Sequence, residues 1–193
     1  NGIKIFAMGA NYIPEDQILD RTSAERTKEL LKSCAAANYN MIRVWGGGIY
    51  PDDYFYDLCD KLGLLVWQDM MFACSVYNAS DMSFCSTVRY ELIDNIRRIR
   101  NHACLGMWCG NNEIESAWQY WGLPDDEELK AGYLRMFEVL APKVVEQYDP
   151  NTFYWPSSPS SGGGFKDSGA RNKGDIHYWD VWHNFKPFTE YKK

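Results

Sequence analysis

Short apolar runs and amphipathic stretches alternate along the chain. Apolar runs bounded by Gly, Asn or Pro predict strands buried on both faces of a sheet. Apolar residues that recur every three or four positions, such as Val88, Leu92 and Ile96, predict helices packed on that sheet. The predicted strands cover residues 3–8, 40–44, 64–67, 104–109, 152–155 and 175–179, and the predicted helices cover residues 23–37, 51–62, 83–100 and 127–147.

Six strand-helix units in a row predict an α/β fold with a parallel sheet and outer helices. An open doubly wound sheet fits this alternation as well as a (β/α)8 TIM barrel does. Two features favour the barrel: no Gly-x-Gly-x-x-Gly follows the first strand, and polar or aromatic residues stand at the strand ends, where barrel active sites lie. A complete barrel takes about 250 residues, so the 193 residues predict an incomplete one with about six units. The Ser- and Gly-rich stretch 157–174 is predicted to be a long loop on the same face.

Composition narrows the possible partners. The net charge of -6 and the pI near 5.1 argue against nucleic acid. No apolar stretch reaches the roughly 18 residues that span a bilayer, so we expect a soluble chain whose compartment is unknown. The 8 Trp and 13 Tyr exceed what a core requires and suit the flat faces of sugar rings.

The six cysteines form no C-x-x-C pair, which favours buried free thiols over disulfides. His102, Cys104 and Cys109 lie close in sequence, as zinc ligands do. The two cysteines, however, have opposite parity on one predicted strand, so their side chains point to opposite faces of the sheet. No metal site is predicted.

The carboxyl group of Glu113 follows the fourth predicted strand, in the tripeptide Asn111-Asn112-Glu113. At a strand end it lies in a cleft, where partial desolvation raises the pKa of a Glu toward the range of a general acid. The alternative is a helix cap, which is the commoner role of an Asn-Glu pair at a strand end.

Four longer segments end successive strands: GANYIP at residues 9–14, MIRVWGGGIY at 41–50, GLLVWQDMMFAC at 63–74 and WCGNNE at 108–113. In this order and spacing they resemble the catalytic barrel of glycoside hydrolase family 2, and its β-mannosidases most closely. The resemblance implies a retaining hydrolase that releases terminal, non-reducing β-D-mannose without a metal or organic cofactor. A family 2 enzyme for galactose, glucuronic acid or glucosamine, or a non-catalytic sugar-binding module, remains an alternative.

The resemblance implies roles for residues at the strand ends. Glu113 is the acid/base, and Asn112 binds the sugar 2-hydroxyl, a contact that strengthens in the transition state. Arg43 orients the nucleophile or keeps it ionised; otherwise it forms an ion pair with a carboxylate. Trp45 forms a wall of the sugar subsite or packs in the core. Asp69 binds a sugar hydroxyl or Arg43, or caps the following turn.

Aromatic residues further along the chain are candidates for the sugar cleft. Trp121 is preferred over Trp118 as a stacking platform, with core packing as the alternative for both. A His or Tyr at the end of the sixth strand commonly hydrogen-bonds the nucleophile in related barrels, which makes His177 and Tyr178 candidates beside Trp179. The pleat that decides which of the three faces inward is not fixed by sequence.

The family's nucleophile is a second Glu at the end of the seventh strand, in a Ser-Glu-Tyr/Phe-Gly context. The pair Glu190-Tyr191 has no apolar strand before it and no Gly after it, so we interpret it as the approach to that strand. Nothing in the chain corresponds to the β-sandwich domains that precede the barrel in family members. We therefore expect residues 1–193 to be one catalytic-barrel segment, inactive alone, whose partners are a β-mannoside glycan and the remaining domains of the parent enzyme.

Overall fold

The computed structural model of the chain describes residues 3–192 and is built on one parallel sheet. Five strands follow one another in the order β1-β2-β3-β4-β5, all parallel. They are β1 (Gly9–Tyr12), β2 (Met41–Val44), β3 (Leu65–Asp69), β4 (Leu105–Cys109) and β5 (Phe153–Trp155). The α/β class with a parallel sheet is confirmed, and the carboxyl ends of all five strands lie at one edge of the sheet.

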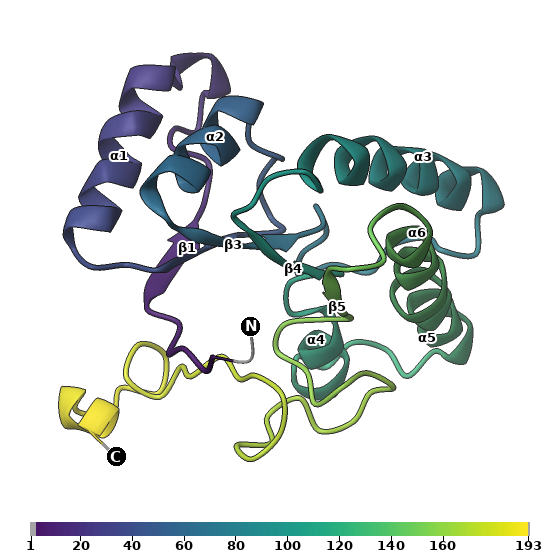
Figure 1. The fold of residues 1–193 in the computed structure, drawn as a ribbon. Coiled ribbons are helices and arrows are strands. Elements are labelled where there is room, and N and C mark those ends of the chain that lie inside the picture. Colours follow the sequence, from purple (N-terminus) through teal and green to yellow (C-terminus); the bar gives the residue numbers. More distant parts are fainter. Residues whose placement is uncertain (1–2, 193) are drawn as a thin grey trace.

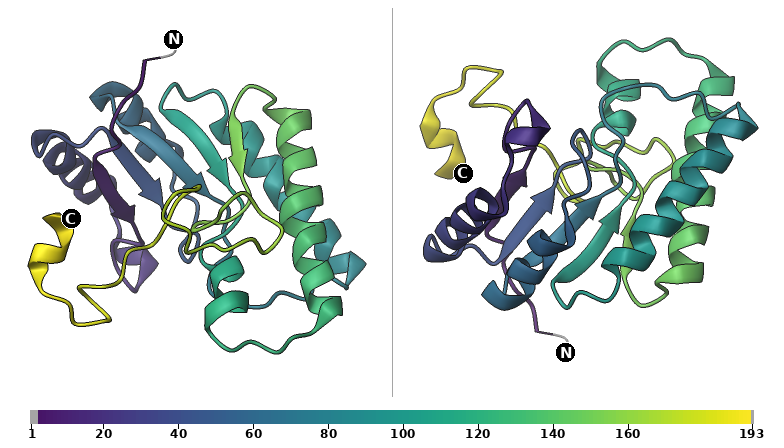
Figure 2. Two further views of the ribbon diagram at one scale, coloured as in Figure 1. Left: turned by 90° about the horizontal axis from the view of Figure 1, so that it is seen from below. Right: turned by 90° about the horizontal axis from the view of Figure 1, so that it is seen from above.

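Helices join the strands. They are α1 (Ala24–Ala36), α2 (Asp53–Leu62), α3 (Met82–Ile99), α4 (Ile114–Tyr120), α5 (Glu127–Leu134) and α6 (Ala141–Tyr148), with the short turns η1 (Leu19–Arg21) and η3 (Phe188–Lys192). Figure 1 shows α1, α2 and α3 on one side of the sheet and the C-terminal segment, in yellow, on the other. The two views of Figure 2 show the same segment crossing the sheet on the side away from these helices.

Local signals in the sequence explain where the outer helices begin and end. The side chain of Ser23 accepts a hydrogen bond from Arg26 N at the start of α1, and that of Asp81 accepts from two backbone N–H groups at the start of α3. Helix α2 ends at Gly63, whose φ of 71° lies in the left-handed region that glycine adopts freely. These caps stabilise the helix termini and fix the residues at which the helices begin and end.

The core lies between the sheet and the helices. Val44 and Val66 from the strands meet Leu31, Phe55 and Ile96 from the helices, and all five side chains are buried. Burying one side chain of this size stabilises the fold by about 1.5–3 kcal/mol. The sheet is therefore a rigid base for the side chains at its carboxyl edge.

Four of the six predicted strands are confirmed, and two are wrong. Residues 3–8 are exposed and form no strand; the side chain of Asn40 accepts a hydrogen bond from Met8 N and donates to Phe6 O, replacing ladder bonds there. Residues 175–179 also form no strand. There, Asp175 makes an isolated antiparallel bridge to Ser160. The predicted loop at 157–174 is irregular, as expected.

The helix predictions needed two corrections. The predicted helix over residues 127–147 consists of α5 and α6, joined by a π-helical stretch, η2 (Arg135–Leu140). Helix α4 was not predicted, because its seven residues are too few for a clear apolar period.

All six cysteines are free thiols, and four of them are buried. Among residues 3–192, none of the helices combines the length and apolar character needed to cross a bilayer.

Candidate active site

Arg43 connects the carboxyl ends of four strands. Its Nη2 lies 2.7 Å from Asp69 Oδ2 and 2.9 Å from Asn112 Oδ1, and its Nη1 lies 3.3 Å from Asn11 Oδ1. The guanidinium also lies over the ring of Trp67, 5.5 Å from its centre. The sheet thus brings together three residues selected from sequence, Arg43, Asp69 and Asn112.

Asp69 is fully buried, and its carboxylate accepts four hydrogen bonds. Arg43 Nε and Trp67 Nε1 donate to Oδ1, whereas Arg43 Nη2 and Gly46 N donate to Oδ2. Burial raises the pKa of Asp69, and the opposing effect of Arg43 does not fully cancel the rise. Because every acceptor position is occupied, this carboxylate supports Arg43 and leaves no lone pair for a sugar hydroxyl.

The backbone of Glu113 is held in an unusual conformation between β4 and α4. Its φ of 63° lies in the left-handed region, which is uncommon for a residue with a side chain. Glu113 N donates to Ser158 O at 2.8 Å, and Asn111 Oδ1 accepts from Ile114 N at the start of α4. Asn111, and not Glu113, therefore caps the helix, and the Glu113 side chain is available for another role.

The side chain of Glu113 is mostly buried and bonded to two other segments. Its Oε1 lies 2.6 Å from His177 Nδ1, and its Oε2 accepts from Cys74 Sγ at 3.5 Å. Burial raises the pKa of Glu113, but the hydrogen bond and charge of His177, helped by Cys74 and Trp179, outweigh burial and leave the pKa below its ordinary value. The net shift is opposite to the one expected from burial alone.

The predicted aromatic residues lie in three places. Trp121, His177, Tyr178 and Trp179 line one pocket together with Glu113. Trp45 instead lines a separate pocket near the starts of α1 and α2. Trp118 is buried and packs edge to face on Phe165. Of the three residues at 177–179, His177 makes the short contact with the Glu113 carboxyl group, at 2.6 Å, and Trp179 also acts on that group.

Three polar residues of this region were not selected as candidates from sequence. Cys74 and Ser158 follow β3 and β5, and Asp175 lies at the end of the long loop. Ser158 Oγ donates to Asp175 Oδ2 at 2.6 Å and lies 3.0 Å from His177 Nε2. A sequence signal exists only for Ser158, which follows a predicted strand by three residues; the other two depend on loop geometry.

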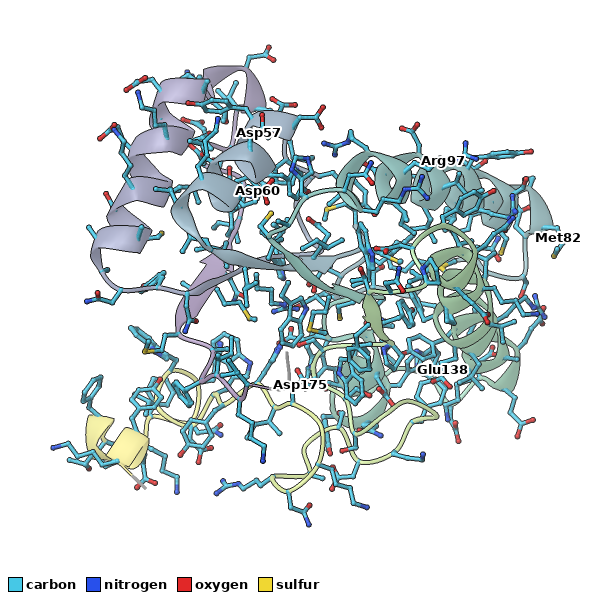
Figure 3. All side chains as sticks on the ribbon, viewed as in Figure 1. Asp57, Asp60, Met82, Arg97, Glu138 and Asp175 are labelled. Atoms are coloured by element: carbon cyan, nitrogen blue, oxygen red, sulfur yellow. The ribbon has the colours of Figure 1, made fainter. Side chains whose placement is uncertain are left out.

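A different cluster of possible metal ligands lies away from this site. Asp57, Asp60 and His102 have ligand atoms within 4.8 Å of one another, and the two aspartates lie on α2, on the other side of the sheet from Asp175 (Figure 3). His102 Nδ1 lies 2.9 Å from Asp60 Oδ2. Cys109 is instead buried at the end of β4, with its thiol bonded to Asn111 O. The three residues His102, Cys104 and Cys109 do not form a common ligand set.

Glu115, two residues after Glu113, is expected to make the stability of the chain depend on pH. It is fully buried on α4, and burial, only partly offset by Ser160 and the backbone of Phe165, raises its pKa from 4.5 to about 7. The folded state therefore keeps a proton that the unfolded chain loses, so stability falls as the pH rises from about 4.5 to about 7. Glu115→Gln is expected to remove this loss, which amounts to about 3 kcal/mol at pH 8.

Urea unfolding of both forms at pH 4.5, 6 and 8 measures the effect. The stability of the variant relative to the original chain should rise with pH, whereas Glu146→Gln, at an exposed site on α6, should give a nearly constant difference. A difference for Glu115→Gln that does not change with pH would contradict a raised pKa at this position.

Comparisons with known proteins show which enzymes this chain resembles. No family model matches the chain. Beta-mannosidase B of Aspergillus fumigatus is 41% identical over 192 residues, which cover 95% of this chain and 22% of that protein. The crystal structure of a β-D-mannosidase from Dictyoglomus thermophilum matches with a TM-score of 0.88 and 42% identity over 98% of this chain and 23% of that one. A β-glucuronidase of Bacteroides uniformis shares the fold, with a TM-score of 0.60 at 22% identity.

These matches, with the parallel sheet and the carboxyl group at its edge, show that the chain is homologous to a segment of the glycoside hydrolases of family 2. Within that family, the relatives that share about 41% of its residues are β-mannosidases. The chain spans about a fifth of the length of these relatives.

Proposed function

We propose that this chain is the acid/base segment of a longer, retaining glycoside hydrolase that releases terminal, non-reducing β-D-mannose. The observation that carries this proposal is the match to a solved β-D-mannosidase over 98% of the chain, with a TM-score of 0.88. The contacts at the edge of the sheet support it, because Arg43 donates to Asn112, and Asn112 and Glu113 both contact Cys74.

The fold of the longer protein is proposed to be a (β/α)8 barrel with β-sandwich domains before it. The strictly sequential strand order supports a barrel, because a doubly wound sheet reverses its order at a switch point. Within residues 3–192, strands β1 and β5 each pair with one neighbour. Further strands of the longer protein would pair with these open edges and close the barrel.

The proposed chemistry uses two carboxyl groups about 5 Å apart. Glu113 donates a proton to the leaving oxygen while a nucleophilic Glu, on a strand outside residues 1–193, attacks the anomeric carbon. Glu113 then takes a proton from the water that hydrolyses the glycosyl-enzyme. General acid-base and nucleophilic catalysis by carboxyl groups supply both steps, so no metal or organic cofactor is needed.

The sugar is proposed to lie against the carboxyl edge of the sheet. Asn112 would hydrogen-bond the 2-hydroxyl, and Arg43, fixed by Asp69, would hold Asn112 and the nucleophile. Trp121, Tyr178 and Trp179 share the pocket of Glu113 and would contact the sugar or the leaving group. Trp45 lines a separate pocket, so a role in the sugar subsite requires a rearrangement in the complete barrel.

Hydrolysis of 4-nitrophenyl β-mannoside by this chain, beside a protein extended through the adjoining domains, tests the proposal. Activity only in the extended protein would support a nucleophile outside residues 1–193. Activity in the short chain would instead require a second carboxylate within it, and Asp69 and Glu190 would be substituted next.

A panel of nitrophenyl glycosides on the extended protein tests the choice of sugar. Galactoside, glucuronide and glucosaminide are the controls, since the fold is shared with β-glucuronidases. Faster turnover of one of these would overturn the choice of mannose. Binding of sugar without turnover of any glycoside would favour a non-catalytic module.

A further inference from the structure

We propose that Ser158 and Asp175 are positioning residues that fix the tautomer of His177, so that His177 and Glu113 share one proton. The catalytic meaning of this inference rests on the proposed role of Glu113 as acid/base. The inference about the tautomer rests on the hydrogen bonds alone and is tested separately.

The four side chains form one continuous series of contacts. Glu113 Oε1 lies 2.6 Å from His177 Nδ1, His177 Nε2 lies 3.0 Å from Ser158 Oγ, and Ser158 Oγ lies 2.6 Å from Asp175 Oδ2. Ser158 is buried, and its backbone also accepts from Glu113 N. The series therefore lies on fixed backbone at both ends, beneath the sheet where Figure 3 labels Asp175.

The direction of each hydrogen bond follows from the chemistry of Asp175. Its Oδ1 already accepts from Trp155 Nε1 at 2.7 Å and from Ser160 N at 3.1 Å. An ionised carboxylate has no proton to give, so the hydroxyl proton of Ser158 points to Asp175 Oδ2. Ser158 Oγ is then left with lone pairs only, and it accepts from His177 Nε2–H.

This arrangement decides what lies between His177 and Glu113. A neutral imidazole with its proton on Nε2 has a lone pair on Nδ1. A separation of 2.6 Å between that lone pair and a carboxylate oxygen requires a proton between them. Glu113 and His177 thus hold one proton in common, either as a carboxylic acid beside a neutral ring or as a carboxylate beside an imidazolium.

The opposite tautomer would not serve the proposed reaction. With its only proton on Nδ1, a neutral His177 would donate to an ionised Glu113, and no further proton would remain for the leaving oxygen. With the ring proton fixed on Nε2, the pair keeps one further proton, which is available for the leaving oxygen. During turnover the shared proton goes to the leaving oxygen as the glycosidic bond breaks, and the water that later attacks the glycosyl-enzyme returns a proton to Glu113.

Other groups that face this series are few among the described residues. Cys74 and Trp179 contact Glu113, and Arg43 reaches it only through Asn112, whose Nδ2 donates to Cys74 Sγ at 3.3 Å. On the other side, Asp175 is close enough to Glu115 to help raise the pKa of that buried carboxyl group. Among the described residues, none of these groups accepts from His177 Nε2–H in place of Ser158.

The substitution Asp175→Asn changes the hydrogen bonding at this position while keeping the side chain nearly the same shape. Trp155 and Ser160 both donate to Oδ1, so they hold the oxygen of the new amide on their side and turn its NH2 group toward Ser158. Ser158 Oγ then accepts from this NH2 group, and its own proton, having lost its acceptor, is expected to turn to His177 Nε2, which moves the ring proton to Nδ1. The matched control is Ser161→Ala, in the same loop, because the Ser161 hydroxyl donates to Asp167 O and lies outside the series.

Nitrogen NMR of the 193-residue chain at pH 8 reads the tautomer directly. The chain contains three histidines, so loss of one signal set in His177→Gln assigns the ring. A protonated Nε2 in the original chain and in Ser161→Ala, with a protonated Nδ1 and bare Nε2 in Asp175→Asn, is the expected result. A bare Nε2 in the original chain would overturn the inference whether or not any variant folds, and so would an unchanged ring in a folded Asp175→Asn.

Kinetics in the extended protein test the catalytic meaning. The alkaline limb of kcat/KM for Asp175→Asn should move to lower pH, because the pair then holds one proton fewer, and Ser158→Ala should move it in the same direction. A lower rate with an unmoved limb would indicate a purely structural role for both residues. An extended protein without glycosidase activity would refute the proposed function and leave the NMR result standing.

Discussion

Glu113→Gln in the extended protein is expected to slow hydrolysis of mannosides with poor leaving groups by about 10²–10⁴-fold, the usual contribution of a general acid. Gln keeps the shape of the side chain but has no acidic proton for the leaving oxygen. Activated aryl mannosides need little protonation, so their first step should be nearly unaffected. Steady-state and burst kinetics on an alkyl mannoside and a dinitrophenyl mannoside measure the two cases.

The comparison of leaving groups is internal to one variant, so it does not depend on the amount of folded protein. An equal loss on both substrates, without a burst on the activated one, would contradict the assignment of Glu113 as acid/base. It would fit a residue that binds the sugar or supports the fold.

Arg43→Ala is expected to destabilise the chain by about 3–5 kcal/mol, because it leaves a fully buried Asp69 without its counter-ion. Asn112 also loses the donor that fixes its side-chain oxygen. Urea unfolding near pH 7 measures the loss. The control is Lys32→Ala, which breaks the exposed pair with Glu29 on α1 and should change stability by no more than about 0.5 kcal/mol.

A double-mutant cycle with Asp69→Asn separates the pair from other effects of the substitution. Because the amide carries no charge, Asp69→Asn should reduce the cost of Arg43→Ala markedly. The interpretation of Arg43 and Asp69 as a buried ion pair is wrong if Arg43→Ala costs the same with and without Asp69→Asn. It is also wrong if Arg43→Ala alone costs less than about 1 kcal/mol.

The sequence predicted the parts of the fold that depend on local apolar patterns. The central strands β2, β3 and β4 lie between covered faces, and their apolar runs are unmistakable. Residues 3–8 and 175–179 carry apolar residues too, yet they form no strand. The Asn40 side chain bonds backbone groups in residues 3–8, and the Asp175 side chain bonds Ser160 N across the loop, and neither contact is visible in a period of apolar residues.

The site was predictable to the extent that strand ends define it. Arg43, Asp69, Asn112 and Glu113 each end or follow a central strand, and the structure places them at one edge. The link from Glu113 through His177 to Ser158 depends on how the loop after β5 returns under the sheet, which no local pattern encodes. Trp45 illustrates the same limit, since the turn after β2 carries its ring into another pocket.

The most direct test of the account uses Glu113→Ala in the extended protein, with 2,4-dinitrophenyl β-mannoside and sodium azide. Azide is an anion and needs no general base, so it should attack the accumulated glycosyl-enzyme, restore turnover and yield β-mannosyl azide, with retained configuration. This product would establish mannose, retention and the role of Glu113 together. The α-mannosyl azide would identify Glu113 as the nucleophile instead, and failure of azide to restore turnover would contradict its role as acid/base.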